Sequence, residues 1–302
     1  MIHAGVTIFL HNIVTPPLVL YSLIYSHQTI CAISTNQKKL VTAACALVAG
    51  LALADGIESA NIVGYNDTSI TADKWYMVAV QFKDVGDKTD VIAFDDLIEV
   101  SGIKPSLWED EDDQAAQIQY WNGKGYDYYY YISDAYAEGT ENLLGKDCWA
   151  VDGVEAKSLK QPLGEGFWLK VPSVAIDGTA VFRTLGEVKN SSSVTVDFTA
   201  NNWKIISNPL PVDVDLNDVV TTGIVASLWE NQDTDAAELQ YWNGKGYDYY
   251  YYISDAYKAG TESLLGKDCW AIDGVQPEGV QIPVGGAAWL RAKQDGSMTF
   301  SL

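Results

Sequence analysis

The sequence predicts an all-β protein made of two tandem copies of a small β-barrel or β-sandwich unit, with minor helical turns. Three observations predict this fold. A long segment occurs twice at a constant offset of 121 residues, and 12% of the residues are aromatic. In each copy, short runs of β-branched and aromatic residues alternate with turns that contain Gly and Asp. Several short strands at near-regular spacing are typical of a barrel or a sandwich.

The repeat is the strongest pattern in the chain. Residues 106–153 and 227–274 are identical at 38 of 48 positions. The offset continues to Trp168 and Trp289, and the segment at Trp75 matches that at Trp203 after a seven-residue insertion in the first copy. Self-similarity at a fixed period indicates repeated structural units. We therefore expect β unit one at 61–181 and β unit two at 182–302.

Each unit contains recognisable strand signals. Residues 118–121 and 126–132 predict the two arms of a β-hairpin around an Asn-Gly-Lys-Gly turn at 122–125. Residues 167–171 and 179–183 predict two further strands, and residues 204–207 predict a strand that stops at Asn208-Pro209. Short helical turns are expected at 213–220 and around 136–144.

The N-terminal segment has the features of a secretory signal peptide. Residues 36–39 form a basic n-region, residues 40–51 are apolar, and Ala52-Leu53-Ala54 is a cleavage pattern. The predicted signal peptide is 36–54, with a mature start at Asp55 or, alternatively, at Asn61. We interpret residues 1–35 as a non-native upstream extension, with a second transmembrane segment as the alternative. We expect a secreted or cell-surface protein that is not inserted in a membrane after signal cleavage.

Charge and histidine content exclude several functions. The chain has 40 Asp and Glu against 19 Lys and Arg, a formal net charge of −21, which argues against nucleic acid or anionic lipid as a partner. All three histidines precede the predicted signal peptide, so the mature chain lacks the histidine of Ser-His-Asp or Cys-His catalysis and of His-containing zinc sites. No carboxylate pair stands out for glycoside hydrolysis. We expect no enzymatic activity, with a glycoside-active enzyme as the weakest alternative.

Aromatic residues of the hairpin are the candidate ligand-binding residues. In a strand, Tyr126, Tyr128 and Tyr130 lie on one face, and Tyr129 and Tyr131 lie on the other. An exposed aromatic face could stack on sugar rings or on another protein. The favoured interpretation is cross-strand aromatic pairing within the sheet, because aromatics are common strand residues. The full candidate set is Trp121, Tyr126, Tyr128, Tyr129, Tyr130, Tyr131, Trp242, Tyr247, Tyr249, Tyr250, Tyr251 and Tyr252.

An acidic loop precedes each hairpin and is the candidate metal site. Calcium binds clustered carboxylate oxygens, and four acidic residues stand at matched positions, namely Glu109, Asp112, Glu230 and Asp233. The other acidic positions of the loop are not matched between copies, and the EF-hand pattern is absent. We favour a solvated charged loop and expect no cofactor, with calcium as the alternative.

Cys148 and Cys269 occupy matched positions, each within Gly-Lys-Asp-Cys-Trp. Buried thiols beside a core Trp are the favoured interpretation. A disulfide within the chain or between chains is the alternative in an exported protein.

Three short segments carry a resemblance. They are Trp-x-x-Ile-Ser-Asn-Pro (Trp203 to Pro209), Tyr-Trp-Asn-Gly-x-Gly-Tyr (Tyr241 to Tyr247) and Gly-x-Gly-Phe-Trp (Gly164 to Trp168). Their order resembles an unnamed β-domain that recurs in exported and cell-surface bacterial proteins. The first unit departs with Val80-Gln81-Phe82, and the second departs with Gly286-Ala287-Ala288. The resemblance implies an extracellular β-module without catalytic activity.

These observations favour a non-catalytic protein of extracellular or cell-surface structure or adhesion, whose partner is protein, through self-assembly or at a cell surface. The alternative is a carbohydrate-binding protein whose Tyr and Trp strips contact a glycan.

Overall fold

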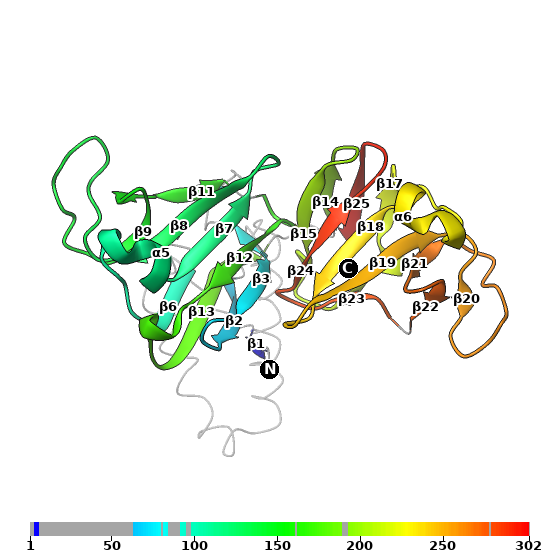
Figure 1. Ribbon diagram of the computed structural model, residues 1–302, viewed down its shortest axis with the longest axis horizontal. Coiled ribbons are helices and arrows are strands. Elements are labelled where there is room, and N and C mark those ends of the chain that lie inside the picture. Colours follow the sequence, from blue (N-terminus) through cyan, green and yellow to red (C-terminus); the bar gives the residue numbers. More distant parts are fainter. Residues whose placement is uncertain are drawn as a thin grey trace, which may run out of the picture. The chain divides into compact units, whose positions relative to one another are not determined.

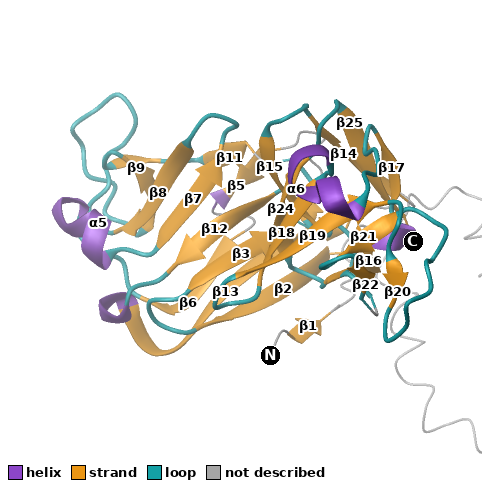
Figure 2. Ribbon diagram, turned by 45° about the vertical axis from the view of Figure 1, so that its right-hand side comes forward, coloured by secondary structure: helices purple, strands orange, loops and turns teal. Residues whose placement is uncertain are grey.

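Strands make up most of the structure (Figures 1 and 2), which confirms the all-β prediction. The computed structural model describes residues 3–5, 63–79, 81–83, 91–94, 98–160, 162–188, 193–277 and 279–301, all within one compact unit. The α-helices of this described part are α5 (Glu111–Gln114) and α6 (Gln232–Asp235). The predicted signal peptide at 36–54, and residues 1–35 apart from 3–5, lie outside it.

The N-terminal half, residues 63–188, contains two large sheets. The first joins β1 (His3–Gly5), β2 (Val63–Ile70), β13 (Ile176–Val188) and β4 (Phe82–Lys83), with β6 (Ile98–Ile103) also paired to β13. The second has the order β10 (Val154–Glu155), β9 (Cys148–Val151), β8 (Tyr126–Ile132), β7 (Gln117–Trp121), β12 (Gly166–Lys170) and β3 (Trp75–Ala79). A small ladder joins β11 (Ser158–Lys160) to β5 (Val91–Ala93).

The C-terminal half, residues 193–301, repeats this strand order. One sheet joins β14 (Ser193–Phe198), β25 (Gly296–Ser301) and β17 (Val220–Thr222). The other joins β15 (Trp203–Ser207), β24 (Ala287–Arg291), β18 (Glu238–Trp242), β19 (Tyr247–Ile253) and β21 (Cys269–Ala271). Two small ladders join β16 (Val214–Asp215) to β23 (Gln281–Ile282) and β20 (Tyr257–Lys258) to β22 (Val275–Gln276).

Each half has a main core between its two sheets, and Val194 of β14 joins the core of the N-terminal half. In the N-terminal half, Phe182 of β13 packs in one cluster with Ile118 of β7 and Phe167 of β12, all fully buried. In the C-terminal half, Phe300 of β25 and Leu290 of β24 share the corresponding cluster. Burying one such side chain stabilises the fold by about 1.5–3 kcal/mol, so these cores hold the sheets together.

The strand β13 marks where the first half ends. Its residues pair with β2, β4 and β6 from Ile176 to Val188, and β14 then pairs with β25 of the other half. The boundary predicted at 181/182 therefore falls inside β13. The two copies of the repeat share few identical residues in this segment, so the repeat did not indicate where the strand ends.

The predicted hairpin and one of the two predicted helical turns are present. β7 and β8 pair in antiparallel register around residues 122–125. Among the described residues, the 3-10 helices are η2 (Trp108–Asp110), η3 (Ser173–Ala175), η4 (Leu216–Asp218) and η5 (Trp229–Asn231), and η4 lies within the turn predicted at 213–220. Residues 136–144 form a loop closed by a Tyr136–Leu143 bridge instead of a helical turn, and Gly139, with φ of 72°, interrupts helical backbone there.

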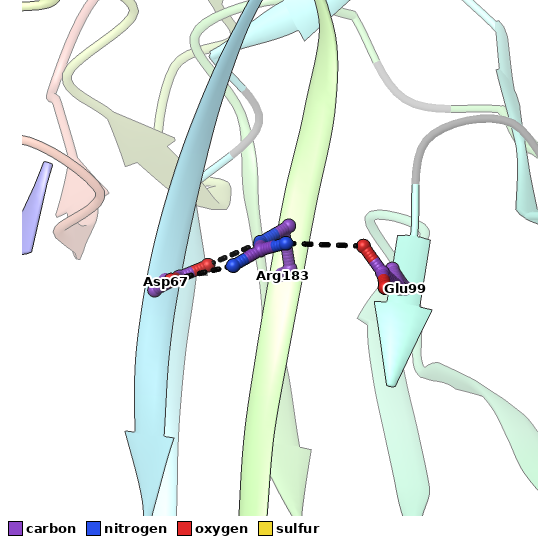
Figure 3. A network of polar contacts seen from close by, with 3 residues as sticks. All are labelled: Asp67, Glu99 and Arg183. Atoms are coloured by element: carbon purple, nitrogen blue, oxygen red, sulfur yellow. Dashed lines mark hydrogen bonds and ion pairs between the residues drawn. The ribbon is translucent and has the colours of Figure 1, made fainter. Parts of the chain in front are cut away.

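A charged network lies across the first sheet (Figure 3). The Arg183 guanidinium on β13 donates two hydrogen bonds to the Asp67 carboxylate on β2, at 2.6 and 2.9 Å, and one to Glu99 on β6, at 3.2 Å. The guanidinium also lies 4.7 Å from the centre of the Tyr65 ring. The bidentate pair with Asp67 joins β13 to β2, and the single bond to Glu99 joins β13 to β6.

Candidate functional site

Aromatic side chains from both halves meet in one cluster, which we call the junction cluster. Its members come from β3, β7, β8 and β12 of the first half and from β15, β18, β19 and β24 of the second. They are Trp75, Met77, Trp121, Tyr126, Trp168, Trp203, Ile205, Trp242, Tyr247, Ala287 and Trp289. Alternation places these side chains on the sheet face opposite each half's own core.

Reciprocal hydrogen bonds connect the halves at this cluster. The Trp121 indole N–H donates to the Trp203 carbonyl at 2.8 Å, and the Trp242 indole N–H donates to the Trp75 carbonyl at 2.9 Å. Since Trp121 matches Trp242 and Trp75 matches Trp203 in the repeat, the two bonds are the same contact made twice in opposite directions. This reciprocity is the pattern of a two-fold, self-complementary interface.

The ring contacts follow the same reciprocity. Trp121 meets Trp289 edge-on with ring centres 5.5 Å apart, and Trp242 meets Trp168 edge-on at 5.6 Å. Such edge-to-face pairs contribute about 0.5–1.5 kcal/mol each beyond their buried area. The two predicted candidates Trp121 and Trp242 therefore hold the halves together.

A groove of about 200 Å³ opens beside these rings. It is lined by residues of both halves, namely Trp75, Gln119, Tyr126, Trp168, Trp242 and Tyr247. Five of these six side chains are aromatic and Gln119 is polar, so the lining combines ring faces and edges with a few hydrogen-bonding groups. This is the composition of a site for a small organic ligand.

Four tyrosines continue from this groove, and we call them the tyrosine strip: Tyr126, Tyr128, Tyr247 and Tyr249. Tyr126 and Tyr247 line the groove. Tyr128 and Tyr249 follow on the same strand faces, with ring centres 6.3 Å from Tyr126 and Tyr247 respectively. They are 42% and 45% exposed. The strip therefore presents aromatic rings to solvent from both halves.

The inner tyrosines of the strip keep their protons. Burial and the neighbouring Tyr247 raise the pKa of Tyr126, which a hydrogen bond from Trp168 partly opposes. Burial and Tyr249 likewise raise the pKa of Tyr247, against a hydrogen bond from Trp289. Both hydroxyls remain neutral and can donate and accept hydrogen bonds.

The remaining candidate tyrosines belong to other surroundings. Tyr129, Tyr131, Tyr250 and Tyr252 are partly buried against the two main cores. Tyr130 is buried, and its hydroxyl donates to Asp112 at 2.8 Å, while Tyr251 is partly buried in the matching cluster of the second half. Burial and the bonded Asp112 carboxylate raise the pKa of Tyr130 to about 12, and burial, Glu238 and Asp233 raise the pKa of Tyr251 to about 12. These six tyrosines pack in clusters of their own half and do not belong to the junction cluster.

The acidic residues of the two loops lie in different surroundings. Glu109 and Glu230 are exposed in η2 and η5. Asp112 accepts a hydrogen bond from the Tyr130 hydroxyl. Among the described residues, no group of three or more His, Cys, Asp or Glu side chains is arranged to hold a metal ion. The same part of the chain has no helix long and apolar enough to cross a membrane.

The two cysteines lie in separate clusters. Cys148 packs with Tyr130 and Ile132, and Cys269 packs with Ile253 and Ala256. Both are buried, and burial raises the pKa of the Cys269 thiol. Burial favours the protonated, unreactive form.

Sequence reasoning missed four tryptophans of the junction cluster as site residues: Trp75, Trp168, Trp203 and Trp289. They come from strands that are distant in sequence from the hairpin. Their signal was present in the repeat, because Trp75 matches Trp203 and Trp168 matches Trp289. No protein-family model matches the chain, and a search of curated proteins found no match.

Proposed function

We propose that the protein is an exported, non-catalytic protein of two tandem β units that binds carbohydrate at an extracellular or cell-surface location. The tyrosine strip is the observation that carries this proposal. Flat, rigid tyrosine rings stack on the apolar faces of sugar rings, while their hydroxyls bond to sugar hydroxyls. Two rings in the groove and two exposed rings form a row that suits successive sugar units.

The charge of the protein supports a neutral ligand. With a formal net charge of −21, the surface disfavours polyanions such as nucleic acids and acidic lipids. Neutral saccharides bind without a charge partner, through stacking and hydrogen bonds. The tyrosine strip offers these two interactions.

Titration calorimetry with soluble neutral oligosaccharides of glucose, mannose and N-acetylglucosamine tests the proposal. The double variant Tyr128→Ser, Tyr249→Ser should bind the saccharide with an affinity lower by about tenfold or more, because a loss of about 1.4 kcal/mol of stacking energy corresponds to a tenfold change in affinity. The control is Leu143→Ser, Leu264→Ser, a pair of side chains 60% and 59% exposed at matched positions outside the strip. Equal binding by wild type and the tyrosine variant would contradict the proposal.

Self-assembly is a second candidate, favoured by exposed apolar side chains that recur in both halves. Leu107 and Trp108 are 46% and 43% exposed, and their counterparts Leu228 and Trp229 are 46% and 44% exposed. Matched apolar patches on both halves could contact further copies of the chain. Sedimentation velocity at rising protein concentration tests this, because assembly would increase the sedimentation coefficient, and Trp108→Ser with Trp229→Ser should suppress the increase.

Export rests on the signal peptide predicted at residues 36–54. Signal-peptidase cleavage after Ala54 would give a mature N-terminus at Asp55. N-terminal sequencing of secreted protein should therefore begin at Asp55, or at Asn61 if the second cleavage site is used. An intact N-terminus recovered from a membrane fraction would contradict export.

A further inference from the structure

A second and larger cavity lies between the halves, and we call it the junction cleft. Its volume is about 330 Å³, at the lower end of the range of about 300–1,000 Å³ that is usual for small-molecule sites. The first half contributes β2, β3 and the turn between them, and the second half contributes β18 and the loop before β24. The lining residues are Thr68, Ser69, Thr71, Lys74, Trp75, Tyr76, Met77, Tyr241, Trp242, Gly244, Pro283, Gly285, Gly286 and Ala287.

The pseudo-equivalent position on the other side of the junction holds a salt bridge. There the Lys204 ammonium of the second half bonds the Glu165 carboxylate of the first half at 2.5 Å, and both side chains are largely buried. The Tyr120 hydroxyl lies 3.5 Å from the same carboxylate. Glu165, Lys204 and Tyr120 therefore lie together at the positions that correspond to Gly286, Tyr76 and Tyr241 of the cleft lining.

The cleft opens where the two copies differ. Glu165 corresponds to Gly286, and Lys204 corresponds to Tyr76. Gly286 has no side chain, and the Tyr76 hydroxyl accepts a hydrogen bond from the Thr71 backbone N–H at 2.6 Å. The salt bridge therefore has no counterpart at the cleft, although the surrounding Trp75 and Trp242 match Trp203 and Trp121 of the filled side.

The lining combines aromatic walls with hydrogen-bonding groups. Trp75, Tyr241 and Trp242 supply ring surface, and Thr68, Ser69 and Thr71 supply hydroxyls. The exposed Lys74 adds an ammonium donor. Aromatic surface beside several hydroxyl-bonding groups suits one sugar ring, which has an apolar face and a rim of hydroxyls.

The cleft adjoins the proposed carbohydrate surface. Trp75 and Trp242 line both the aromatic groove and the junction cleft. A saccharide chain stacked on the tyrosine strip could thus place a sugar unit past these two rings. The strip is pseudo-symmetric, whereas the cleft exists on the side that lacks the salt bridge.

We infer that the junction cleft binds the terminal sugar unit of a neutral saccharide and sets the direction in which the chain lies on the tyrosine strip. This inference rests on the proposed carbohydrate function and adds a site to it. The loss of the salt bridge at one of two equivalent positions makes a pseudo-symmetric surface directional. A ligand with two different ends is then bound in one orientation.

A pair of matched double variants tests the inference. Tyr76→Lys with Gly286→Glu places the salt-bridge residues in the cleft. A Cβ atom on Gly286 would lie 2.9 Å from the Pro283 ring, but Glu165 is accommodated three residues after Pro162 on the filled side, so a small shift of the loop should suffice. Glu165→Gly with Lys204→Tyr makes the reverse change at the other position and serves as the control.

Calorimetric titration with cellohexaose and chitohexaose, beside thermal melts of each variant, gives the readout. For the hexasaccharide that binds, the variant with the filled cleft should have about tenfold lower affinity, because it loses the contacts of one sugar ring. The control variant should bind at least as well as wild type. Unchanged binding by the filled variant would overturn the inference, and so would equal losses in both variants. If Tyr128→Ser, Tyr249→Ser lowers affinity while the filled variant does not, the carbohydrate function stands without the cleft. Absence of binding by wild type would overturn both.

Discussion

Neighbouring tyrosines of β8 occupy three different environments. Tyr126 lies in the junction cluster, Tyr128 is exposed, and Tyr130 is buried beneath the Asp112 carboxylate. All three point to the same face of the strand. Strand alternation therefore predicted the face correctly but could not predict its surroundings, because the residues of the second half that meet Tyr126 in the junction cluster come from segments distant in sequence.

Replacing Tyr129 with Ser should destabilise the protein by about 3 kcal/mol, because its ring packs against the first core, 5.2 Å from the Phe94 ring centre, and its loss leaves a cavity. Replacing Tyr128, which is 42% exposed, should change the stability by within ~0.5 kcal/mol. Urea unfolding followed by tryptophan fluorescence measures both. Equal, large losses from the two variants would show that Tyr128 is also covered.

The Glu111 carboxyl links stability to pH. Its Oε2 is buried without a hydrogen-bond partner among the described residues. Burial, followed by the charges of Asp112, Asp152 and Asp134, raises the pKa of Glu111 to about 7. A carboxyl whose pKa is higher in the folded state binds more protons when folded, so its contribution to stability decreases as the pH rises from about 4.5 to about 7.

The substitution Glu111→Gln should remove this contribution, and the second half already carries Gln232 at the matched position, with its Oε1 likewise buried and unpartnered. The variant should melt at a higher temperature than wild type at pH 7.5 and at nearly the same temperature at pH 4.5. Scanning calorimetry across this pH range is the measurement. A melting-temperature difference independent of pH would mean that Glu111 titrates normally.

At the scale of elements, the hairpins were predictable because their determinants are local. The Asn122 side-chain oxygen accepts hydrogen bonds from the backbone N–H groups of Lys124 and Gly125, both at 3.0 Å. Its amide donates to Asp127 at 2.9 Å. Gly123, which follows Asn122 in the turn, has φ of 90°, a conformation that residues other than glycine rarely adopt. The extent of β13 was not predictable, since its end is set by pairing with β2 and β4.

Removal of the Asn122 side chain should therefore weaken the hairpin. Asn122→Ala loses three hydrogen bonds of a partly exposed turn and should destabilise the protein by about 1–2 kcal/mol. Asn243→Ala should do the same, because Asn243 makes the same three bonds in the second half. The control is Gly125→Ala, where an added Cβ meets nothing within 4 Å. Chemical denaturation of the three variants gives the comparison, and a loss in the control equal to that of Asn122→Ala would point to turn rigidity instead.

At the scale of the whole molecule, the repeat indicated two similar halves but not how they associate. The junction cluster joins Trp residues that stand 82 and 167 positions from their hydrogen-bond partners. Nothing in the local pattern of either strand distinguishes a ring that contacts another half from one that faces solvent. The predicted ligand-binding residues therefore lie in different places: Trp121 and Trp242 belong to the junction cluster, and Tyr128 and Tyr249 are exposed.

Removing the two reciprocal hydrogen bonds should uncouple the halves. Each half has a main core formed by its own sheets, apart from Val194 of β14, which joins the core of the first half, so the contacts between the halves are what make them unfold together. Trp121→Phe removes the N–H that donates to the Trp203 carbonyl. Trp242→Phe removes the N–H that donates to the Trp75 carbonyl. Each change leaves a partly buried carbonyl without its donor, at a cost of about 1–3 kcal/mol.

Calorimetry should show one unfolding transition for wild type and two for the double variant Trp121→Phe, Trp242→Phe, since weaker coupling lets the less stable half unfold first. Trp108→Phe is the control, because Trp108 is 43% exposed and belongs to neither the junction nor a main core. Single variants should lower the melting temperature without dividing the transition, as one reciprocal bond and the ring contacts remain. One unshifted transition in the double variant would mean that the other contacts between the halves, such as the ring packing and the Lys204–Glu165 ion pair, couple them without a contribution from the indole N–H groups.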